Sequence, residues 1–141
     1  MRDFNAFMAG NALTEETVKY VVSKRFKVKG KPVAWEIKAV DSAKDELIRK
    51  ECTKKVPIAG KRGQFNLETD NDEYIAKLCA ASIVYPELDN AELQDSYGVK
   101  SAKALLGRML KPGEYADLKL KVMEVNGFDV TMDELVDEAK N

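Results

Sequence analysis

Residues 70–86 read DNDEYIAKLCAASIVYP and predict a helix with one buried face. Its apolar and small side chains recur every three or four positions, at Tyr74, Ile75, Leu78, Cys79, Ser82 and Ile83. Asp70 or Asp72 supplies a side-chain cap for the first turn, and Pro86 ends the pattern because proline cannot continue a helix. This is the strongest helical pattern of the chain.

A β-hairpin is predicted upstream of this helix, over about residues 19–40. The segment KYVVSKRF (19–26) is rich in β-branched and aromatic residues, and KVKGKP (27–32) supplies turn residues. The segment VAWEIKAV (33–40) alternates, so that its apolar side chains face one way; these are Val33, Trp35, Ile37 and Ala39. Because an isolated hairpin is marginally stable in water, this face should pack against the helices.

Two further segments separate the hairpin from residue 70. A helix is expected to begin at Ser42, which forms an approximate capping box with Asp45, and to end near Thr53. Its apolar stripe consists of Ala43, Leu47, Ile48 and Cys52. The segment that follows, residues 54–65, contains proline, glycines and several cationic residues, and we expect an exposed, flexible loop there.

The C-terminal half of the chain predicts a series of short helices. Asp89 starts a short turn or helix, Ser101 opens a second helix, residues 114–125 form a third, and Thr131 caps a last one. The predicted fold class is therefore α+β and mainly α, with an N-terminal β-hairpin (about 19–40) followed by five or six short helices.

The composition indicates one folded, charge-balanced domain. Of the 141 residues, 45% are hydrophobic and 33% are charged, and the net charge of -1 provides no global attraction to nucleic acid or an anionic membrane. Residues 1–17 lack a sustained periodicity and are interpreted as a mobile N-terminal arm, and residues 18–141 as a single domain. Neither a signal peptide nor a transmembrane run is evident, so a cytoplasmic location without membrane partners is expected.

Few residues are suited to catalysis or metal binding. The chain has no histidine, which removes the commonest general base and the usual metal ligand. Cys52 and Cys79 occupy apolar helical positions and are expected to be reduced core thiols. Acidic pairs such as Asp70 and Asp72 stand at helix starts, where carboxylates serve as caps. We therefore expect no catalytic residues, no cofactor and no metal.

The residues leave two other functions open. The first is a small nucleic-acid-binding or regulatory module that uses the basic segment 54–62, with Lys54, Lys55, Lys61 and Arg62 as phosphate contacts. No set of aromatic residues is interleaved with these charges, so nucleic acid is not the expected partner. The second is a cysteine-dependent enzyme, which would require an activated thiol.

Four segments, taken in order and with their spacing, resemble the XkdN-like family of phage tail assembly chaperones. They are SKRFKVKGKPVAWEIKAV (23–40), IRKECTKKVP (48–57), YIAKLCAASIVYPELDNAELQDSYGV (74–99) and LLGRMLKPGEYADLKLKVMEVNGFD (105–129). The resemblance extends from about Tyr20 to Asn141, and it is weakest in residues 1–17. The family occurs in contractile-tailed phages and in phage-derived elements of Bacillus and its relatives.

The resemblance implies a non-enzymatic protein of the bacterial host cytoplasm that is absent from the mature virion. Such a chaperone binds and solubilises the tape measure protein and helps to recruit tail tube subunits during tail morphogenesis. Amphipathic helices suit this role, because they can cover the apolar stripes of a client protein reversibly. Exposed helical faces can also pair with each other when no client covers them, so the sequence allows a homo-oligomer.

The candidate partner-binding residues lie at the C-terminal end of the chain and are Phe128, Val130, Leu135 and Val136. A short terminal helix can leave its own core and dock onto a groove or helix of a client. The alternative interpretation is that these side chains close the helical core.

Overall fold

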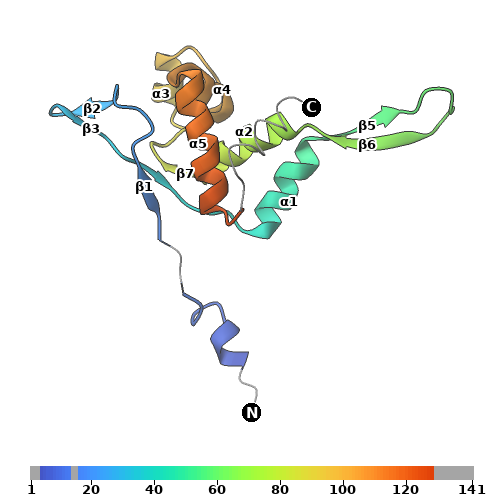
Figure 1. Cartoon of the computed structure of the whole chain (residues 1–141), viewed down its shortest axis with the longest axis horizontal. Helices are drawn as coiled ribbons and strands as arrows, with labels where there is room; N and C mark the ends of the chain where they lie inside the picture. Colours follow the sequence, from blue (N-terminus) through green and yellow to red (C-terminus); the bar gives the residue numbers. More distant parts are fainter. Residues whose placement is uncertain (1–3, 14–15, 129–141) are drawn as a thin grey trace.

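Helix α2 (Asn71–Ser82) lies at the centre of the molecule in the computed structural model, which describes residues 4–13 and 16–128 (Figure 1). Its buried side chains are those of Tyr74, Ile75, Ala76, Leu78, Cys79 and Ser82. Asp70 caps the first turn, with its side-chain oxygen Oδ1 accepting a hydrogen bond from the backbone N–H of Glu73 at 3.1 Å. The predicted central helix and its Asp70 cap are confirmed.

The C-terminal end of this helix differs from the prediction. The pattern continued the helix through Ile83, whereas Ile83 starts strand β7 (Ile83–Tyr85). The residues of β7 are β-branched or aromatic, which favours a strand. Ile83 is buried, with 7% of its surface exposed. A buried residue at this position fits both a helix and a strand, so the apolar spacing could not distinguish the two.

Strand β7 completes a three-stranded antiparallel sheet with β1 (Val18–Tyr20) and β4 (Trp35–Ile37), in the order β1-β4-β7. Trp35 and Ile37 of the middle strand are 2% and 0% exposed, so this face of the sheet belongs to the core. The sequence did not predict β7 as a third strand.

The hairpin predicted over residues 19–40 is broadly consistent with the structure, in which β1 and β4 are antiparallel neighbours. Its tip is a smaller two-stranded ribbon of β2 (Lys27–Val28) and β3 (Lys31–Pro32). Lys29 and Gly30 connect these strands with φ values of 52° and 78°, the left-handed region that a two-residue hairpin turn requires.

Helix α1 (Ser42–Glu51) forms where a helix was expected, but its cap and apolar stripe differ. Asp41, not Ser42, caps the helix, and its Oδ1 accepts a hydrogen bond from the backbone N–H of Lys44 at 2.8 Å. Ile48 is buried as predicted, whereas Leu47 is 57% exposed. The predicted apolar stripe covered more of the helix surface than is buried, because α1 packs against the core along one narrow side.

The segment 54–65, predicted as a loop, lies instead within a β-hairpin. Strands β5 (Thr53–Pro57) and β6 (Phe65–Thr69) pair antiparallel, and Figure 1 shows them projecting from the body. Gly60 and Gly63 have φ values of 77° and 76° in the connecting turn. The prediction was wrong because the proline and glycines that were assigned to a loop stand at the end of one strand and in the turn.

Helix α3 (Ala91–Ser96) is followed by α4 (Ala102–Met109) and α5 (Pro112–Val125), and α4 and α5 pack against α2 (Figure 1). Ser101 caps α4 as predicted, whereas α3 is capped by Asn90 and not by Asp89. The fully buried side chains that these helices contribute are Leu105, Leu106, Leu118 and Val122.

Asn126, at the end of α5, forms hydrogen bonds to two other parts of the fold. Its Oδ1 accepts a hydrogen bond from the backbone N–H of Val40 at 2.9 Å, and its Nδ2 donates to Ser82 Oγ at 3.0 Å. Gly127 follows with a φ of 86°, as expected for a left-handed helix stop. The last predicted helix, from Thr131, lies outside the described residues.

The described part of the N-terminal arm contains a 3-10 helix, η1 (Phe4–Phe7), with no buried residue. Phe4 and Phe7 are 71% and 85% exposed. The mobility of residues 1–17 and the single domain over 18–141 stay predictions. None of the helices in the described parts of the chain combines the length and apolar character needed to cross a membrane.

The different burial of two leucines gives a first prediction. Leu78→Ala should lower the free energy of unfolding by about 2–5 kcal/mol, because it opens a cavity at a fully buried position. The matched control Leu47→Ala should change it by less than about 0.5 kcal/mol, since Leu47 is mostly exposed. Urea unfolding followed by circular dichroism measures both, and equal losses would contradict the packing described.

Candidate partner-binding surface

The ribbon formed by residues 53–69 is an exposed element that projects from the body (Figure 1). All five residues of β6 are exposed, and none of the ribbon's residues is buried. A two-stranded hairpin gains little stability on its own in water, so a ribbon without a covering layer offers both faces to a partner. It is therefore the first candidate surface.

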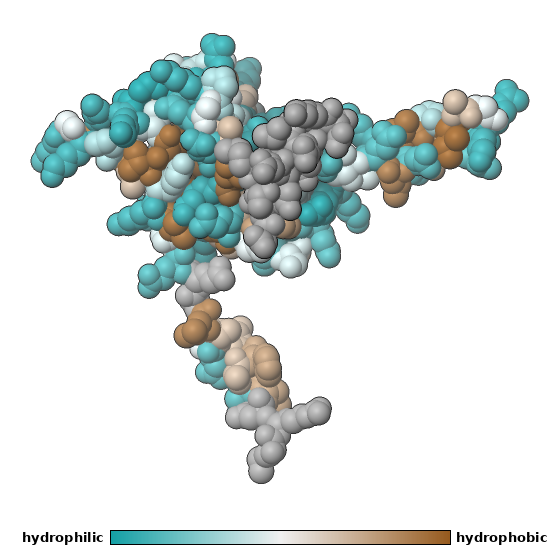
Figure 2. All heavy atoms as spheres, in the orientation of Figure 1, coloured by the Kyte–Doolittle hydropathy of each residue, from teal (hydrophilic) through white to brown (hydrophobic). Residues whose placement is uncertain are grey.

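One face of the ribbon is apolar toward its tip. Side chains of directly paired residues share a face, and the register pairs Pro57 with Phe65, Lys55 with Leu67 and Thr53 with Thr69. Phe65 and Leu67 are 54% and 72% exposed, and Figure 2 shows hydrophobic atoms along the ribbon at the right of the view. We call Pro57, Phe65 and Leu67 the apolar face.

The ribbon is also basic. It carries four cationic side chains against the single carboxylate of Glu68, and the cations are those of Lys54, Lys55, Lys61 and Arg62. All four cationic residues are exposed, and no ion pair joins them to any other residue in the described ranges. The ribbon thus combines apolar side chains with positive charge that the body does not neutralise.

A hollow along α1 adjoins the base of the ribbon. It is lined by Ala43, Glu46, Leu47, Arg49, Lys50 and Thr53. Its large exposed apolar side chain is that of Leu47, and the predicted stripe had placed both Leu47 and Ala43 inward. Because Thr53 lines the hollow and also belongs to the ribbon face that carries Phe65 and Leu67, the two surfaces are continuous.

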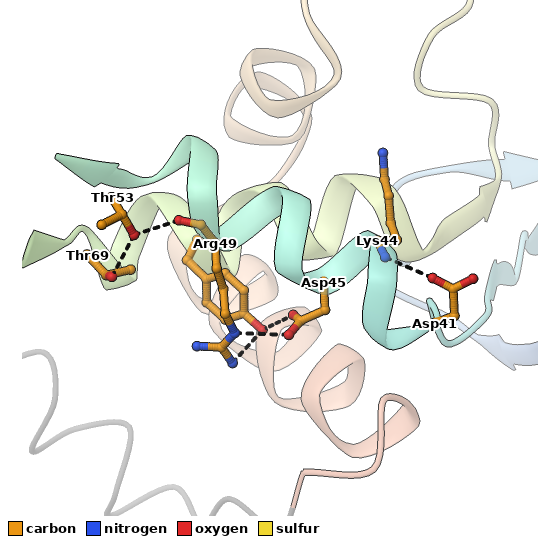
Figure 3. A network of polar contacts seen from close by, with 7 residues as sticks. Asp41, Lys44, Asp45, Arg49, Thr53 and Thr69 are labelled. Carbon is orange, nitrogen blue, oxygen red and sulfur yellow. Dashed lines mark hydrogen bonds and ion pairs between the residues drawn. The ribbon is translucent and has the colours of Figure 1, made fainter. Parts of the chain in front are cut away.

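A polar network fixes this junction (Figure 3). Arg49 donates from Nε to Asp45 Oδ2 at 2.9 Å and from Nη2 to the hydroxyl of Tyr74 at 3.0 Å, and the Tyr74 hydroxyl donates to Asp45. The Thr53 hydroxyl donates to the carbonyl oxygen of Arg49 at 2.7 Å and lies 2.8 Å from the Thr69 hydroxyl. Helix α1, helix α2 and both strands of the ribbon therefore meet at one set of hydrogen bonds.

The network shifts the pKa values of its members. Burial, together with the hydrogen bond donated to Asp45, raises the pKa of Tyr74 to about 12. Burial acts to raise the pKa of Asp45, but the hydrogen bonds from Tyr74 and Arg49 outweigh it and leave that pKa below its ordinary value. Asp45 is thus held as a carboxylate and Tyr74 as a neutral phenol, the pair of states in which each hydrogen bond forms.

Residues 4–140 match the family described as "Phage XkdN-like tail assembly chaperone protein, TAC". The chain belongs to this family of tail assembly chaperones. The resemblance inferred from the four sequence segments is thereby confirmed.

Two proteins of Bacillus subtilis (strain 168) are similar to this XkdN-like chaperone along nearly its whole length. The "Uncharacterized protein YqbN" is 33% identical over 141 residues, which cover 99% of this chain and 93% of YqbN. The "Phage-like element PBSX protein XkdN" is 30% identical over 141 residues, covering 99% of this chain and 94% of XkdN. A crystal structure of YqbN superimposes with a TM-score of 0.79 at 30% identity, covering 92% of this chain and 99% of that one.

The partner-binding residues predicted from the sequence of this XkdN-like chaperone lie mostly outside the described residues. Phe128 is half-buried and packs against the core, and its N–H donates to the carbonyl oxygen of Met123 at 3.0 Å. Val130, Leu135 and Val136 fall in the range 129–141, so their role stays a prediction.

Sequence reasoning missed the apolar face of the ribbon. The signal was present as the alternation of Phe65, Leu67 and Thr69 in the segment FNLET, which is the period of a strand. The proline and glycines beside it favoured a loop, and the predicted loop extended to Phe65.

The cysteines of this chaperone have the properties of core thiols. Cys52 and Cys79 are both free and 0% exposed. Burial raises the pKa of Cys79 to about 12 and also raises the pKa of Cys52. A nucleophilic cysteine needs a lowered pKa and access, and neither thiol has them. Within the described ranges, no group of three or more potential ligand residues could hold a metal ion.

The junction network yields a prediction about pH. Tyr74→Phe removes a hydrogen bond to Asp45, so the pKa of Asp45 should rise toward its ordinary value. A lowered carboxyl pKa contributes stability above the unfolded-state pKa that is lost as the pH falls through the folded-state value. The variant should therefore be less stable than wild type by roughly 0.5–1.5 kcal/mol near neutral pH, with a smaller difference below about pH 4.

Carboxyl titration by NMR and urea unfolding at several pH values measure these two effects. Tyr85→Phe is the matched control, because Tyr85 is 47% exposed and lies outside this network. An Asp45 pKa that is equal in wild type and Tyr74→Phe would contradict the role assigned to the hydroxyl.

The burial of the two cysteines yields a prediction about thiol labelling. A disulfide reagent should label Cys52 and Cys79 at least about a hundredfold more slowly in the native protein than in denaturant. A Leu47→Cys variant supplies an exposed thiol in the same fold and should be labelled quickly. Rapid native labelling of either natural cysteine would instead support the cysteine-dependent enzyme.

Proposed function

We propose that this chain binds the tape measure protein, keeps it soluble and helps to recruit tail tube subunits during tail morphogenesis. The observation that carries the proposal is membership of the XkdN-like tail assembly chaperone family over residues 4–140. The chaperone would act in the bacterial host cytoplasm, without catalysis, and leave before the virion matures.

The structure offers a physical basis for client binding. The apolar face of the ribbon and the hollow along α1 form one surface that joins at Thr53, with exposed Leu47, Phe65 and Leu67 as its apolar members. A tape measure protein exposes long apolar helical stripes until the tail tube encloses it, and the three apolar side chains of this surface, called the apolar track below, can cover part of such a stripe. Basic side chains beside the track would favour an acidic client segment.

A second client contact is proposed at the C-terminal end, with Phe128, Val130, Leu135 and Val136. Phe128, the first of these residues, follows α5, and its N–H donates to the carbonyl oxygen of Met123 in that helix. The sequence of residues 129–141 combines apolar side chains with several carboxylates, which fits an amphipathic segment.

The alternative function, a nucleic-acid-binding or regulatory module, would use the four cations of the ribbon. The ribbon places Lys54 and Lys55 on opposite faces, because neighbouring residues of a strand point to opposite sides. The cations are thus not gathered on one face, and Phe65 is the ribbon's one aromatic residue. A protein client fits this arrangement better than a phosphate backbone does.

The proposed function is tested by co-expression with the tape measure protein of the same phage or element. Wild type should raise the soluble fraction of that protein and elute with it from a sizing column. Leu47→Asp should reduce the co-eluting fraction by roughly tenfold, because it places a charge in the apolar track. Leu135→Asp combined with Val136→Asp tests the C-terminal contact in the same way.

Val28→Asp is the matched control, since Val28 is 61% exposed at the tip formed by β2 and β3, away from the track. It should bind the client as wild type does. If the tape measure protein is equally insoluble with and without this chain, and no complex elutes, the function proposed here is wrong.

A further inference from the structure

The two edges of the ribbon are chemically different, and the difference follows from its hydrogen-bond pattern. The N–H of Ile58 donates to the carbonyl oxygen of Gln64 at 3.1 Å, and the N–H of Asp70 donates to that of Cys52 at 2.8 Å. Hydrogen-bonded and non-hydrogen-bonded residue pairs alternate along an antiparallel ladder. These two contacts therefore determine which pairs of the ribbon are hydrogen-bonded.

The alternation of hydrogen-bonded pairs also identifies the backbone groups that face outward. The hydrogen-bonded pairs between the two contacts are Lys54 with Glu68 and Val56 with Asn66. The other residues direct their backbone polar groups away from the ribbon; these are Thr53, Lys55 and Pro57 on β5, and Phe65, Leu67 and Thr69 on β6. Each strand thus presents its own row of outward groups.

The β5 edge is poorly suited to accept another strand. Pro57 has no N–H and occupies one of the outward positions, and Lys54 and Lys55 place charge along the same edge. Proline and lysine are the residues with which proteins prevent pairing at a sheet edge.

The β6 edge has no such protection. Phe65, Leu67 and Thr69 keep their outward N–H groups, and the strand contains neither proline nor lysine. Within the described ranges, β6 pairs with β5 alone. A free edge of this kind is a template for one more strand.

We propose that β6 pairs with β6 of a second copy of this chain, antiparallel and centred on Leu67. In this register Leu67 lies opposite Leu67 of the second copy, Phe65 opposite Thr69, and Asn66 opposite Glu68. No like charges are directly opposed, and the outward N–H and C=O groups of Phe65, Leu67 and Thr69 meet their counterparts. This pairing joins two copies of the chain and does not depend on the identity of the client.

Charge complementarity beyond the strand favours the second copy as the occupant. Antiparallel pairing brings the basic tip of one ribbon, with Lys61 and Arg62, toward the acidic start of α2 in the other chain, which carries Asp72 and Glu73. Asp72 is exposed and has no ion pair in the described part of the chain. Pairing through β5 centred on Lys55 would instead bring two lysines into opposition.

The pairing would convert two marginal ribbons into one four-stranded antiparallel sheet. Leu67 of each copy would lie beside its equivalent, so that exposed apolar side chains gain neighbours without a change in the body. The N–H of Leu67 is not used within the ribbon, which makes it the most informative position to alter.

Sedimentation equilibrium of the full chain over a range of concentrations tests the proposal. Wild type should dimerise, and Leu67→Pro should raise the dimer dissociation constant roughly ten- to a hundredfold, because it removes the central outward donor from each copy. Lys55→Pro is the matched control: it makes the same change at the directly paired residue on the other edge, and it should leave the dimer intact.

A charge swap tests the register and guards against misfolding of the proline variants. Arg62→Glu and Asp72→Arg alone should each weaken the dimer about two- to fivefold, and the double variant should recover wild-type affinity because opposite charges again face each other. Recovery requires contact between two copies in the stated orientation.

Three results would overturn the proposal. They are a monomer at every concentration, a dimer that is lost with Lys55→Pro and retained with Leu67→Pro, and a double charge swap without recovery. A monomeric wild type whose client binding is lost with Leu67→Pro would likewise overturn it and assign the β6 edge to a strand of the client.

Discussion

Helix α2 loses its contact with water only when α1, α4, α5 and the sheet surround it together. Leu78 and Cys79 are 0% exposed, and burial of a leucine-sized side chain contributes about 1.5–3 kcal/mol. No single neighbour covers this helix, so each of the surrounding elements gains its own burial from the presence of the others. Three hydrogen bonds then fix the arrangement: Asn126 bonds to Val40 and to Ser82, and Tyr74 bonds to Asp45.

Much of this fold could be predicted from the sequence, since its helices carry strong local signals. The spacing from Tyr74 to Ser82, the capping residues Asp70 and Ser101, and the stop at Gly127 each express one conformational preference. Where two signals competed, the sequence was ambiguous. Ile83 faces the core in either conformation, and Leu47 matches a helical stripe although α1 packs through a narrower face.

The candidate surface was harder to predict for a physical reason. A strand is recognised by burial on one face, and the ribbon has no layer against which to bury one. Its turn-forming residues, Gly60 and Gly63, are typical both of a loop and of a tight hairpin connection. The network at its base joins residues distant in sequence, Asp45 and Tyr74, which no local pattern relates.

The ribbon's lack of buried residues separates its stability from that of the body. Local unfolding requires only the free energy of the contacts it breaks, and opening the ribbon breaks none of the core. The ribbon can therefore melt and re-form many times while α2 and its neighbours stay folded. Local unfolding of the ribbon would therefore release a partner bound there and leave the core folded.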